Sequence, residues 1–383
     1  MNKYRLGDIC KIVSGSTPKT GIPEYWDGDI KWITPAEISD DAYIISDSVR
    51  KITQEGVKST GLTILPKGTV ILSSRAPIGK VAIAGCDIYC NQGFKNLICS
   101  DVIDNKYLYW FLKAKKSYLN SLGRGATFKE ISKQIVADIE INVPSKETQN
   151  NIVSILEQVN NIISLRKREI QVLSEIVTAR FIELFGDPME NPKGWKVVTI
   201  GEVVTDVRYG TSKPAVMGGK YPYLRMNNIT ADGHLNLADL KYIDIPDDEI
   251  EKCIVRKGDV LFNRTNSIEL VGKTAFFDLP NDMVIAGYII RVRLNEKLLP
   301  EVFSQYLNLD SLKSVLRAMA KGAVNQANIN AQELQNIKIY LPDMVLQKQF
   351  IEIKEQVEKS KVTQIHALKK INILILINRV LVT

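Results

Sequence analysis

The chain has 383 residues, of which 45% are hydrophobic and 24% are charged, so it has the composition of a globular protein of two or three domains. Its net charge of +7 suits a polyanionic partner but does not require one. The five cysteines are an odd number in a long chain, which argues against a secreted disulfide framework and favours a reduced, cytoplasmic protein.

The two ends of the chain and its histidines bear on whether the protein is secreted, spans a membrane or binds a metal. The first residues contain no signal-peptide core, and the apolar run 373–377 is too short to cross a bilayer. Cys86 and Cys90 lie four residues apart, but the only histidines, His234 and His366, are distant in sequence. A zinc site needs four well-placed ligands, so we expect neither a metal nor a cofactor.

The sequence repeats itself with a period of nearly 200 residues. Landmarks recur in the same order at offsets between 189 and 198, which disfavours chance similarity. The matched pairs are Leu6–Ile9 with Ile200–Val203, Leu65–Leu72 with Val255–Phe262, Ser74–Arg75 with Asn263–Arg264, Gly79–Ala82 with Gly272–Ala275, Gln92–Phe94 with Ala286–Tyr288, Arg124–Ala126 with Lys321–Ala323, and Gln149 with Gln347.

The first part of each copy is predicted to mix helices and strands. Short β-rich runs at 69–72 and 80–83 are bounded by Pro and Gly. Residues 106–122 have helical spacing of apolar residues. Alternation of polar and apolar residues at 138–143, and again at 336–341, predicts half-buried strands that end at a proline.

A long helix is predicted to complete each copy. After Pro144, Ser145 is a plausible N-cap, and an apolar stripe from Leu156 to Leu184 has coiled-coil spacing with one gap, at Arg166. The second helix begins near Asp343, and its stripe from Phe350 to Val382 is interrupted by the polar residues Ser360, Gln364 and Asn378.

A helix of about 40 residues is roughly 60 Å long, which exceeds the length of its own domain. We therefore expect the two helices to pack together, antiparallel, as a spacer. The alternative is that each helix lies on its own domain. The expected organisation is a first domain at 1–144, a helix at 145–186, a linker at 187–194, a second domain at 195–342 and a helix at 343–383.

Several segments resemble the target recognition domains of the specificity subunits of type I restriction–modification enzymes. The similar segments are Gly15–Thr20, Tyr25–Ile38, Ser73–Ile83, Asn91–Lys95, Phe185–Pro188 and Pro192–Trp195. The resemblance covers nearly the whole chain. The second domain departs from the pattern, because Ser74–Gly79 becomes Asn263–Ile268 with a longer connection to Gly272. This divergence is expected if the two domains recognise different half-sites.

The resemblance implies an α+β fold, in which two similar globular α/β target recognition domains are separated by two long antiparallel coiled-coil helices. Each domain would read one half of a bipartite double-stranded DNA target, and the helices would fix the gap. The implied partners are two methyltransferase (modification) subunits and motor–nuclease (restriction) subunits, with no membrane. The subunit itself would be non-catalytic.

Motifs for catalysis are missing from the sequence. It contains no G-x-x-x-x-G-K-[ST] phosphate loop, no Asn-Pro-Pro-Tyr stretch, no H-E-x-x-H and no G-x-S-x-G. The acidic segment 246–252 is interpreted as a solvated loop. A DNA-binding subunit without enzymatic activity is therefore expected.

DNA recognition needs cations for phosphates, and guanidinium or amide groups for base edges. Residues of these kinds stand mostly in or beside Gly-containing loops. The candidates in the first domain are Ser16, Thr17, Lys19, Arg75, Lys80, Gln92, Lys95, Arg124 and Lys129. Those in the second domain are Arg208, Tyr209, Ser212, Lys213, Arg225, Asn227, Asn228, Arg264, Asn266, Lys273, Lys321, Asn325 and Gln326. For the four tryptophans, core packing is favoured over stacking on bases.

Three other hypotheses remain open at this point. The chain could serve a system in which methyltransferase and nuclease are fused in one polypeptide. It could instead be a coiled-coil scaffold without a role in DNA binding. An enzyme without recognisable motifs is the weakest hypothesis, because only two histidines are available.

Overall fold

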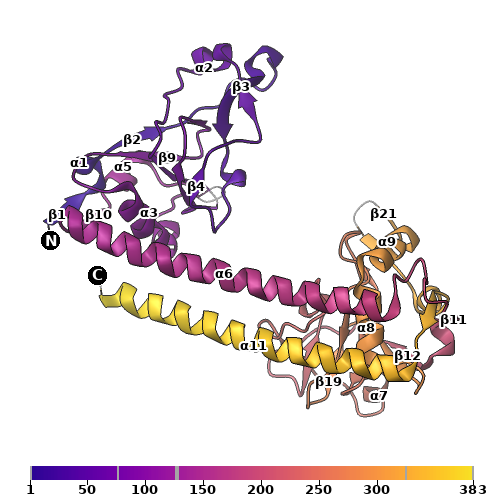
Figure 1. Ribbon diagram of the computed structural model, residues 1–383. Helices are drawn as coiled ribbons and strands as arrows, with labels where there is room; N and C mark the ends of the chain where they lie inside the picture. The colour runs from indigo at the N-terminus through magenta and orange to yellow at the C-terminus, as the bar shows by residue number, and fades with distance from the viewer. Residues whose placement is uncertain (1, 76, 126–128, 324–325, 382–383) are drawn as a thin grey trace. The chain divides into compact units, whose positions relative to one another are not determined.

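The computed structural model describes residues 2–75, 77–125, 129–323 and 326–381, without the side chains of 321–323, 326 and 372–381. The chain forms two compact units (Figure 1). The first contains residues 1–165 and 370–383, and the second contains residues 166–369.

The first unit has a central five-stranded sheet and a second, three-stranded sheet. Its elements in chain order are β1 (Asn2–Arg5), α1 (Leu6–Ile9), β2 (Cys10–Ser14), β3 (Trp26–Ile33), β4 (Ile44–Ile45), β5 (Lys51–Ile52), α2 (Gln54–Thr60), β6 (Val70–Leu72), β7 (Val81–Ala84), β8 (Tyr89–Cys90), β9 (Lys95–Cys99), α3 (Asn105–Ala114), α4 (Lys116–Ser121), α5 (Lys133–Ala137), β10 (Glu140–Val143) and α6 (Lys146–Phe185), which continues into the second unit. The sheet orders are β2-β9-β6-β7-β4 and β5-β3-β8, and β1 pairs with β10. Every residue of β6 and β7 is buried, as expected for short apolar strands inside a sheet.

The second unit repeats this architecture. Its elements are β11 (Lys196–Thr199), β12 (Val204–Tyr209), β13 (Tyr221–Leu224), β14 (Lys241–Ile243), α7 (Ile250–Cys253), β15 (Ile254–Val255), β16 (Val260–Asn263), β17 (Thr265–Asn266), β18 (Thr274–Phe276), β19 (Met283–Ile285), β20 (Ile289–Leu294), α8 (Pro300–Asn308), α9 (Asp310–Met319), β21 (Lys321–Ala323), β22 (Gln326–Asn328), α10 (Ala331–Gln335), β23 (Lys338–Leu341) and α11 (Met344–Leu381). The sheet orders are β12-β20-β16-β18, β14-β13-β19-β15 and β17-β22-β21, and β11 pairs with β23.

The helical segment predicted at 106–122 is two helices, because the chain leaves helical geometry at Lys115 (φ −99°, ψ 20°). The corresponding helices α8 and α9 are separated at Leu309, which has extended backbone geometry (φ −66°, ψ 142°). Leu112 and Leu119, one on each side of the break at Lys115, are both buried in the same core.

The two long helices begin where the sequence predicts. The Ser145 hydroxyl accepts a hydrogen bond from the Thr148 amide (3.3 Å), as an N-cap does. Helix α6 ends at Phe185, and the next residue, Gly186, has φ +85°, a conformation that often follows the end of a helix. The second helix, α11, begins one residue after Asp343.

Within the second unit, the C-terminal half of α6 and the N-terminal half of α11 lie side by side and antiparallel (Figure 1). Phe181 meets Phe350 edge to face, with ring centroids 5.3 Å apart. Arg166 Nη1 donates to Gln364 Oε1 (2.6 Å), so the polar gaps of the two apolar stripes face each other. Beyond residue 371 the predicted stripe lies outside the described side chains.

The duplication is confirmed by two glutamines that make the same bonds in both copies. Gln149 Oε1 accepts from the Asp104 amide (2.7 Å), while its Nε2 donates to the carbonyls of Val102 and Pro144 (3.1 and 3.0 Å).

Gln347 makes the equivalent bonds in the second unit. Its Oε1 accepts from the Leu299 amide (2.9 Å), and its Nε2 donates to the carbonyls of Lys297 and Pro342 (3.0 and 2.9 Å). Both glutamines are fully buried. Each glutamine lies in the first turn of a long helix. It bonds to the proline that follows the preceding strand, and to the loop that leads into α3 in the first unit or α8 in the second.

Two predicted matches are wrong by one residue. The Ser74 amide donates to the Gly93 carbonyl (2.8 Å), and the equivalent bond in the second unit runs from the Arg264 amide to the Tyr288 carbonyl (3.0 Å). Arg264 therefore corresponds to Ser74, and Tyr288 corresponds to Gly93.

The neighbouring positions shift in the same way. Arg75 corresponds to Thr265, and Gln92 corresponds to Gly287. The first match was wrong because it aligned Arg75 with Arg264 and did not allow for the longer connection before Gly272. The second was wrong because it aligned Gly93 with Gly287.

Among the described residues, no helix has the length and apolar character needed to cross a membrane. All five cysteines are free thiols.

We expect Gln149→Ala to lower the free energy of unfolding of the first unit by about 2 to 4 kcal/mol, because it removes three hydrogen bonds that a fully buried side chain makes to the backbone. Urea denaturation, with hydrogen exchange of peptides around Asp104 as the readout for the first unit, measures this change. Gln158→Ala, at an exposed position of the same helix, is the matched control. Equal effects of the two substitutions would contradict the bonding role of Gln149.

Candidate nucleic-acid interface

In the first unit, two of the predicted cations pair with one carboxylate, Glu130, and a third is joined to it through the backbone. Arg75 Nε lies 2.9 Å from Glu130 Oε2, and Lys95 Nζ lies 3.0 Å from Glu130 Oε1. The backbone of Arg124 pairs with that of Glu130 through two hydrogen bonds (3.0 and 2.9 Å). Lys129 precedes Glu130 and is exposed.

Other loops join this cluster. The Thr17 hydroxyl donates to Gln92 Oε1. The loop that carries Gln92 is bonded to the chain just before Arg75, through the bond between Gly93 and Ser74 described above. The predicted residues Thr17, Arg75, Gln92, Arg124 and Lys129, together with Glu130 and the buried Lys95 that pairs with it, form what we call the first loop surface.

Glu130 stays ionised at neutral pH. Burial raises the pKa of this carboxyl, but the hydrogen bonds from Lys95 and Arg75 and their charges outweigh it and hold the pKa below its usual range. The carboxylate therefore orients the two cations and leaves the first loop surface with a net positive charge.

In the second unit, Arg264 lies over the ring of Tyr209, with its guanidinium carbon 4.9 Å from the ring centroid. The Tyr209 hydroxyl accepts a hydrogen bond from the Ala331 amide (2.8 Å), which fixes the ring. Within the described part of the chain, the buried Arg264 Nε has no hydrogen-bond partner. The Tyr209 ring therefore orients this guanidinium.

Strands β17, β22 and β21 lie next to Arg264. Asn266 pairs with Ala327 of β22 and donates from Nδ2 to Asn263 Oδ1 (2.7 Å). Lys321 and Gln326 are strand residues of the β21–β22 hairpin, and Asn325 lies outside the described residues. We call Tyr209, Arg264, Asn266 and Tyr288, with strands β21 and β22, the second loop surface, whereas no contact described for Ser212 joins it to this group.

Two predicted lysines have a structural role instead. Lys273 is buried and donates to the backbone carbonyls of Met226 and Ile229, and burial lowers its pKa. Lys80, at the equivalent position, donates to the Pro35 carbonyl (3.2 Å). The match between the two lysines was correct, but a lysine beside a glycine was not a sign of an exposed cation.

The remaining candidates are not joined to the two loop surfaces by the contacts described here. Lys213 pairs with Glu249 (2.7 Å), Arg225 with Asp239 (2.7 Å) and Arg208 with Asp206 (2.9 Å). Asn228 is buried and bonded to backbone, whereas Asn227 is exposed. The backbone carbonyls of Ser16 and Lys19 accept the indole N–H groups of Trp32 and Trp26, and the Lys19 side chain is exposed.

Sequence reasoning missed two residues of these surfaces, Glu130 and Tyr288. Glu130 was overlooked because only cations and amides were sought, although it lies one residue beyond Lys129. Tyr288 is half exposed, and its carbonyl accepts from the Arg264 amide and from Asn263 Nδ2 (both 3.0 Å). Its place in the duplication, close to the predicted residue Gln92 of the first copy, could have indicated it.

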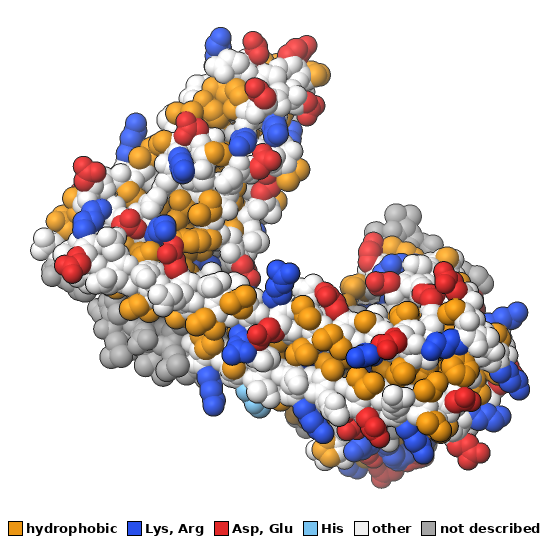
Figure 2. All heavy atoms as spheres, viewed as in Figure 1, with side chains coloured by type: hydrophobic (Ala, Val, Ile, Leu, Met, Phe, Trp, Pro, Cys, Tyr) orange, Lys and Arg blue, Asp and Glu red, His pale blue; other side chains and the backbone are white. Residues whose placement is uncertain are grey.

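Other features of the two units are less suited to a ligand. Trp26 and Trp32 are buried and pack edge to face, as expected for core residues. No cluster of His, Cys, Asp or Glu among the described residues could hold a metal ion. Figure 2 shows Lys, Arg, Asp and Glu side chains interspersed over the visible face, without a single basic field.

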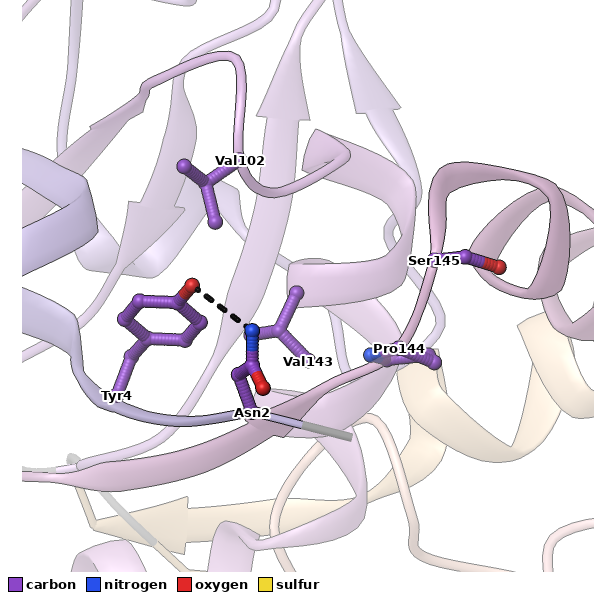
Figure 3. A pocket seen from close by; sticks show the side chains of 6 residues that line it. All are labelled: Asn2, Tyr4, Val102, Val143, Pro144 and Ser145. Carbon is purple, nitrogen blue, oxygen red and sulfur yellow. Dashed lines mark hydrogen bonds between the residues drawn. The ribbon is translucent and has the colours of Figure 1, made fainter.

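A pocket of about 290 Å³ lies beside the β1–β10 pair (Figure 3). No side chain that lines it is charged, and it includes no member of the first loop surface. Its lining residues are Asn2, Tyr4, Val102, Val143, Pro144 and Ser145.

Comparison with known proteins identifies the family. The family model described as the type I restriction modification DNA specificity domain matches residues 1–175 and 192–374. The chain is 37% identical over 247 residues to the type I restriction enzyme MjaIX specificity subunit of Methanocaldococcus jannaschii, covering 59% of this chain but only 57% of that relative. It is 25% identical over 391 residues to the MjaVIII specificity subunit of the same organism, covering 93% and 89%.

Solved structures agree at the level of the fold. The type I restriction–modification S subunit from M. genitalium has a TM-score of 0.53 at 15% identity, over 97% of this chain and 93% of that one. A chain from a structural study of type I restriction–modification complex assembly has a TM-score of 0.60 at 19% identity, over 97% and 95%. The duplicated α+β fold and the family match over both copies place this chain in the family of DNA specificity subunits of type I restriction–modification systems.

Proposed function

We propose that each unit reads one half of a bipartite DNA target through its own loop surface. One observation supports this most strongly: the two units share a scaffold down to single hydrogen bonds, yet differ at the loop positions. At equivalent positions the first and second units carry Ser74 and Arg264, Arg75 and Thr265, Gln92 and Gly287, and Glu130 and Asn328. Two recognition domains that read different sequences are expected to share the scaffold and to differ in the polar residues of their loops.

The side chains suggest how the bases are distinguished. Arg264, stacked on Tyr209, presents the forked donor that pairs bidentately with guanine in the major groove. In the first unit, Glu130 can accept from a cytosine amino group or orient Arg75 toward a base. Lys129 and Arg124 are exposed and suit phosphate contacts, which add affinity without sequence preference.

The proposed complex follows from the family. Two methyltransferase subunits bind the specificity subunit, motor–nuclease subunits join the restricting complex, and the chain itself supplies no catalytic group. The long helices α6 and α11 fix the gap between the half-sites, and the domain limits are those expected from the sequence, 1–144 and 195–342. The complex works in the cytoplasm, where the host DNA is.

We expect Arg264→Ala to relax base preference at one position of one half-site. The loss of a bidentate contact should weaken binding to the native target by about 1 to 3 kcal/mol, and to a duplex already changed at that base pair by much less. Binding of the methyltransferase complex to a set of single-base variants of the target measures this pattern.

Arg168→Ala, an exposed arginine on α6, is the matched control and should leave the profile unchanged. A uniform loss across all duplexes for Arg264→Ala would indicate a phosphate contact. Changes in both half-sites would exclude separate reading by the two units.

A second experiment should distinguish a lysine that binds phosphate from a lysine that stabilises the fold. Lys129→Ala should lower the slope of log affinity against log salt by about one, with an unchanged melting temperature, because it removes one exposed charge. Lys273→Ala should lower the melting temperature, because it leaves two carbonyls of a buried loop without a donor. The reverse assignment of the two effects would contradict the placement of both residues.

A further inference from the structure

We infer that two short loops, one in each unit, fix each recognition domain on its own long helix, and that Tyr43 and His234 are positioning residues for the distance between the half-sites. This inference rests on the proposed bipartite recognition. The loops span residues 39–46 and 229–236, and we call them the first and second tether loops. Each ends on a glutamate of a long helix within the same unit.

The first tether loop contacts α6. The Tyr43 hydroxyl donates to Glu157 Oε1, and Lys106 of α3 lies 2.9 Å from the same oxygen. The Tyr43 ring packs on Tyr109 and Trp110, with centroids 4.8 and 5.9 Å away. The hydroxyl is therefore aimed at the helix by a packed aromatic cluster.

The second tether loop contacts α11 through an ionic arrangement. His234 Nε2 lies 3.5 Å from Glu358 Oε2, and His234 Nδ1 lies 3.2 Å from Asp232 Oδ2. Glu358 Oε1 is 2.9 Å from Nζ of Lys361, a buried lysine on the same helix. The imidazole donates to both carboxylates, and pairs with them as a cation, only when both of its nitrogens carry protons.

Equivalent lysines hold both loops to their domains. Lys116 of α4 pairs with Asp40 (2.7 Å), and Lys313 of α9, its counterpart, lies 3.5 Å from the Ala231 carbonyl. Lys313 is buried, and burial lowers its pKa to about 8. Lys80 and Lys273, described above, bind the chain just before the first loop and at the start of the second. Each loop is thus anchored in its domain before it reaches the helix.

The second loop is also rigid in itself. The Thr230 hydroxyl accepts from the His234 amide (2.9 Å) and donates to the His234 carbonyl (3.0 Å), and Gly233 has φ +84°. In both units a loop anchored by two lysines contacts a glutamate of the long helix. The units differ in one anchor, which is the Asp40 carboxylate in the first and the Ala231 carbonyl in the second, and in the position of the glutamate along its helix. Because the helix fixes the gap in the proposed complex, rotation of a domain on its helix alters the distance at which its half-site can be bound.

The two contacts respond differently to pH. Hydrogen bonds to Asp232 and Glu358 raise the pKa of His234 to about 9, although partial desolvation of the imidazole opposes this shift. The stabilisation from this ion pair is therefore complete below the ordinary histidine pKa of about 6.5 and is lost as the pH rises through 9. Burial raises the pKa of Tyr43 above its usual range, so the first contact does not titrate in this interval. The charged groups that face or act on this site are Asp232, Glu358, Lys361, Lys354 and Lys313.

The experiment compares duplexes that carry the native half-sites with a gap of native length, or one base pair longer or shorter. It uses the full chain with its methyltransferase partner. We expect the double variant Tyr43→Phe and His234→Gln to lower the preference for the native gap by about fivefold, as loss of part-exposed polar contacts does. Discrimination against a single-base change within a half-site should stay within about twofold of wild type.

The controls remove similar groups away from the tethers. Tyr118→Phe alters an exposed tyrosine, and Glu355→Gln alters an exposed glutamate of α11 one turn before Glu358. An unchanged gap preference in the double variant overturns the tether inference. A wild-type complex that binds both half-sites but accepts every gap overturns the proposed spacer instead.

A second measurement is independent of DNA. The chain has two histidines, so exchange of the imidazole C2 proton, followed by mass spectrometry, reports on His234 and His366 separately. We expect a midpoint near pH 9 for His234, which moves toward its ordinary value in Glu358→Gln and stays in Glu355→Gln. If His234 titrates at its ordinary pKa in the unaltered chain, the proposed ionic contact between the second tether loop and α11 is contradicted.

Discussion

The geometry of each half of the chain depends on one buried glutamine. Gln149 and Gln347 each bond to three backbone groups. These are the carbonyl of the proline that follows a strand, and one carbonyl and one amide of the loop that leads into α3 or α8. Because these bonds are directional and the glutamines that make them are buried, each long helix leaves its domain in a defined direction. A molecule proposed to hold recognition loops at a fixed distance needs this rigidity at both junctions.

The shared scaffold leaves the polar edge free to vary. Buried lysines such as Lys273 and Lys313 serve backbone carbonyls inside the domain, and cations in the loop surfaces are oriented by Glu130 or by the Tyr209 ring. Specificity can therefore change by substitution of loop residues, while the bonds that determine the fold persist. The comparison of the two units within one chain illustrates this separation of roles.

Much of the fold could be predicted from the sequence, because its signals are local. The duplication, the strands that end at Pro144 and Pro342 and the two long helices follow from periodicity and capping. The site was harder to predict, since a lysine looks the same in sequence whether it is solvated or buried under a loop. Glu130 was missed because only cations and amides were sought, and no local pattern could have shown its pairing with Arg75, which lies 55 residues away in the sequence.

Sequencing of methylated bases in the host genome, with and without this gene, tests the central claim most directly. Separate reading by the two units predicts that one bipartite motif, two short sequences at a constant gap, loses its methylation when the gene is deleted. An unchanged methylation pattern, or the loss of a single continuous motif, would contradict the account.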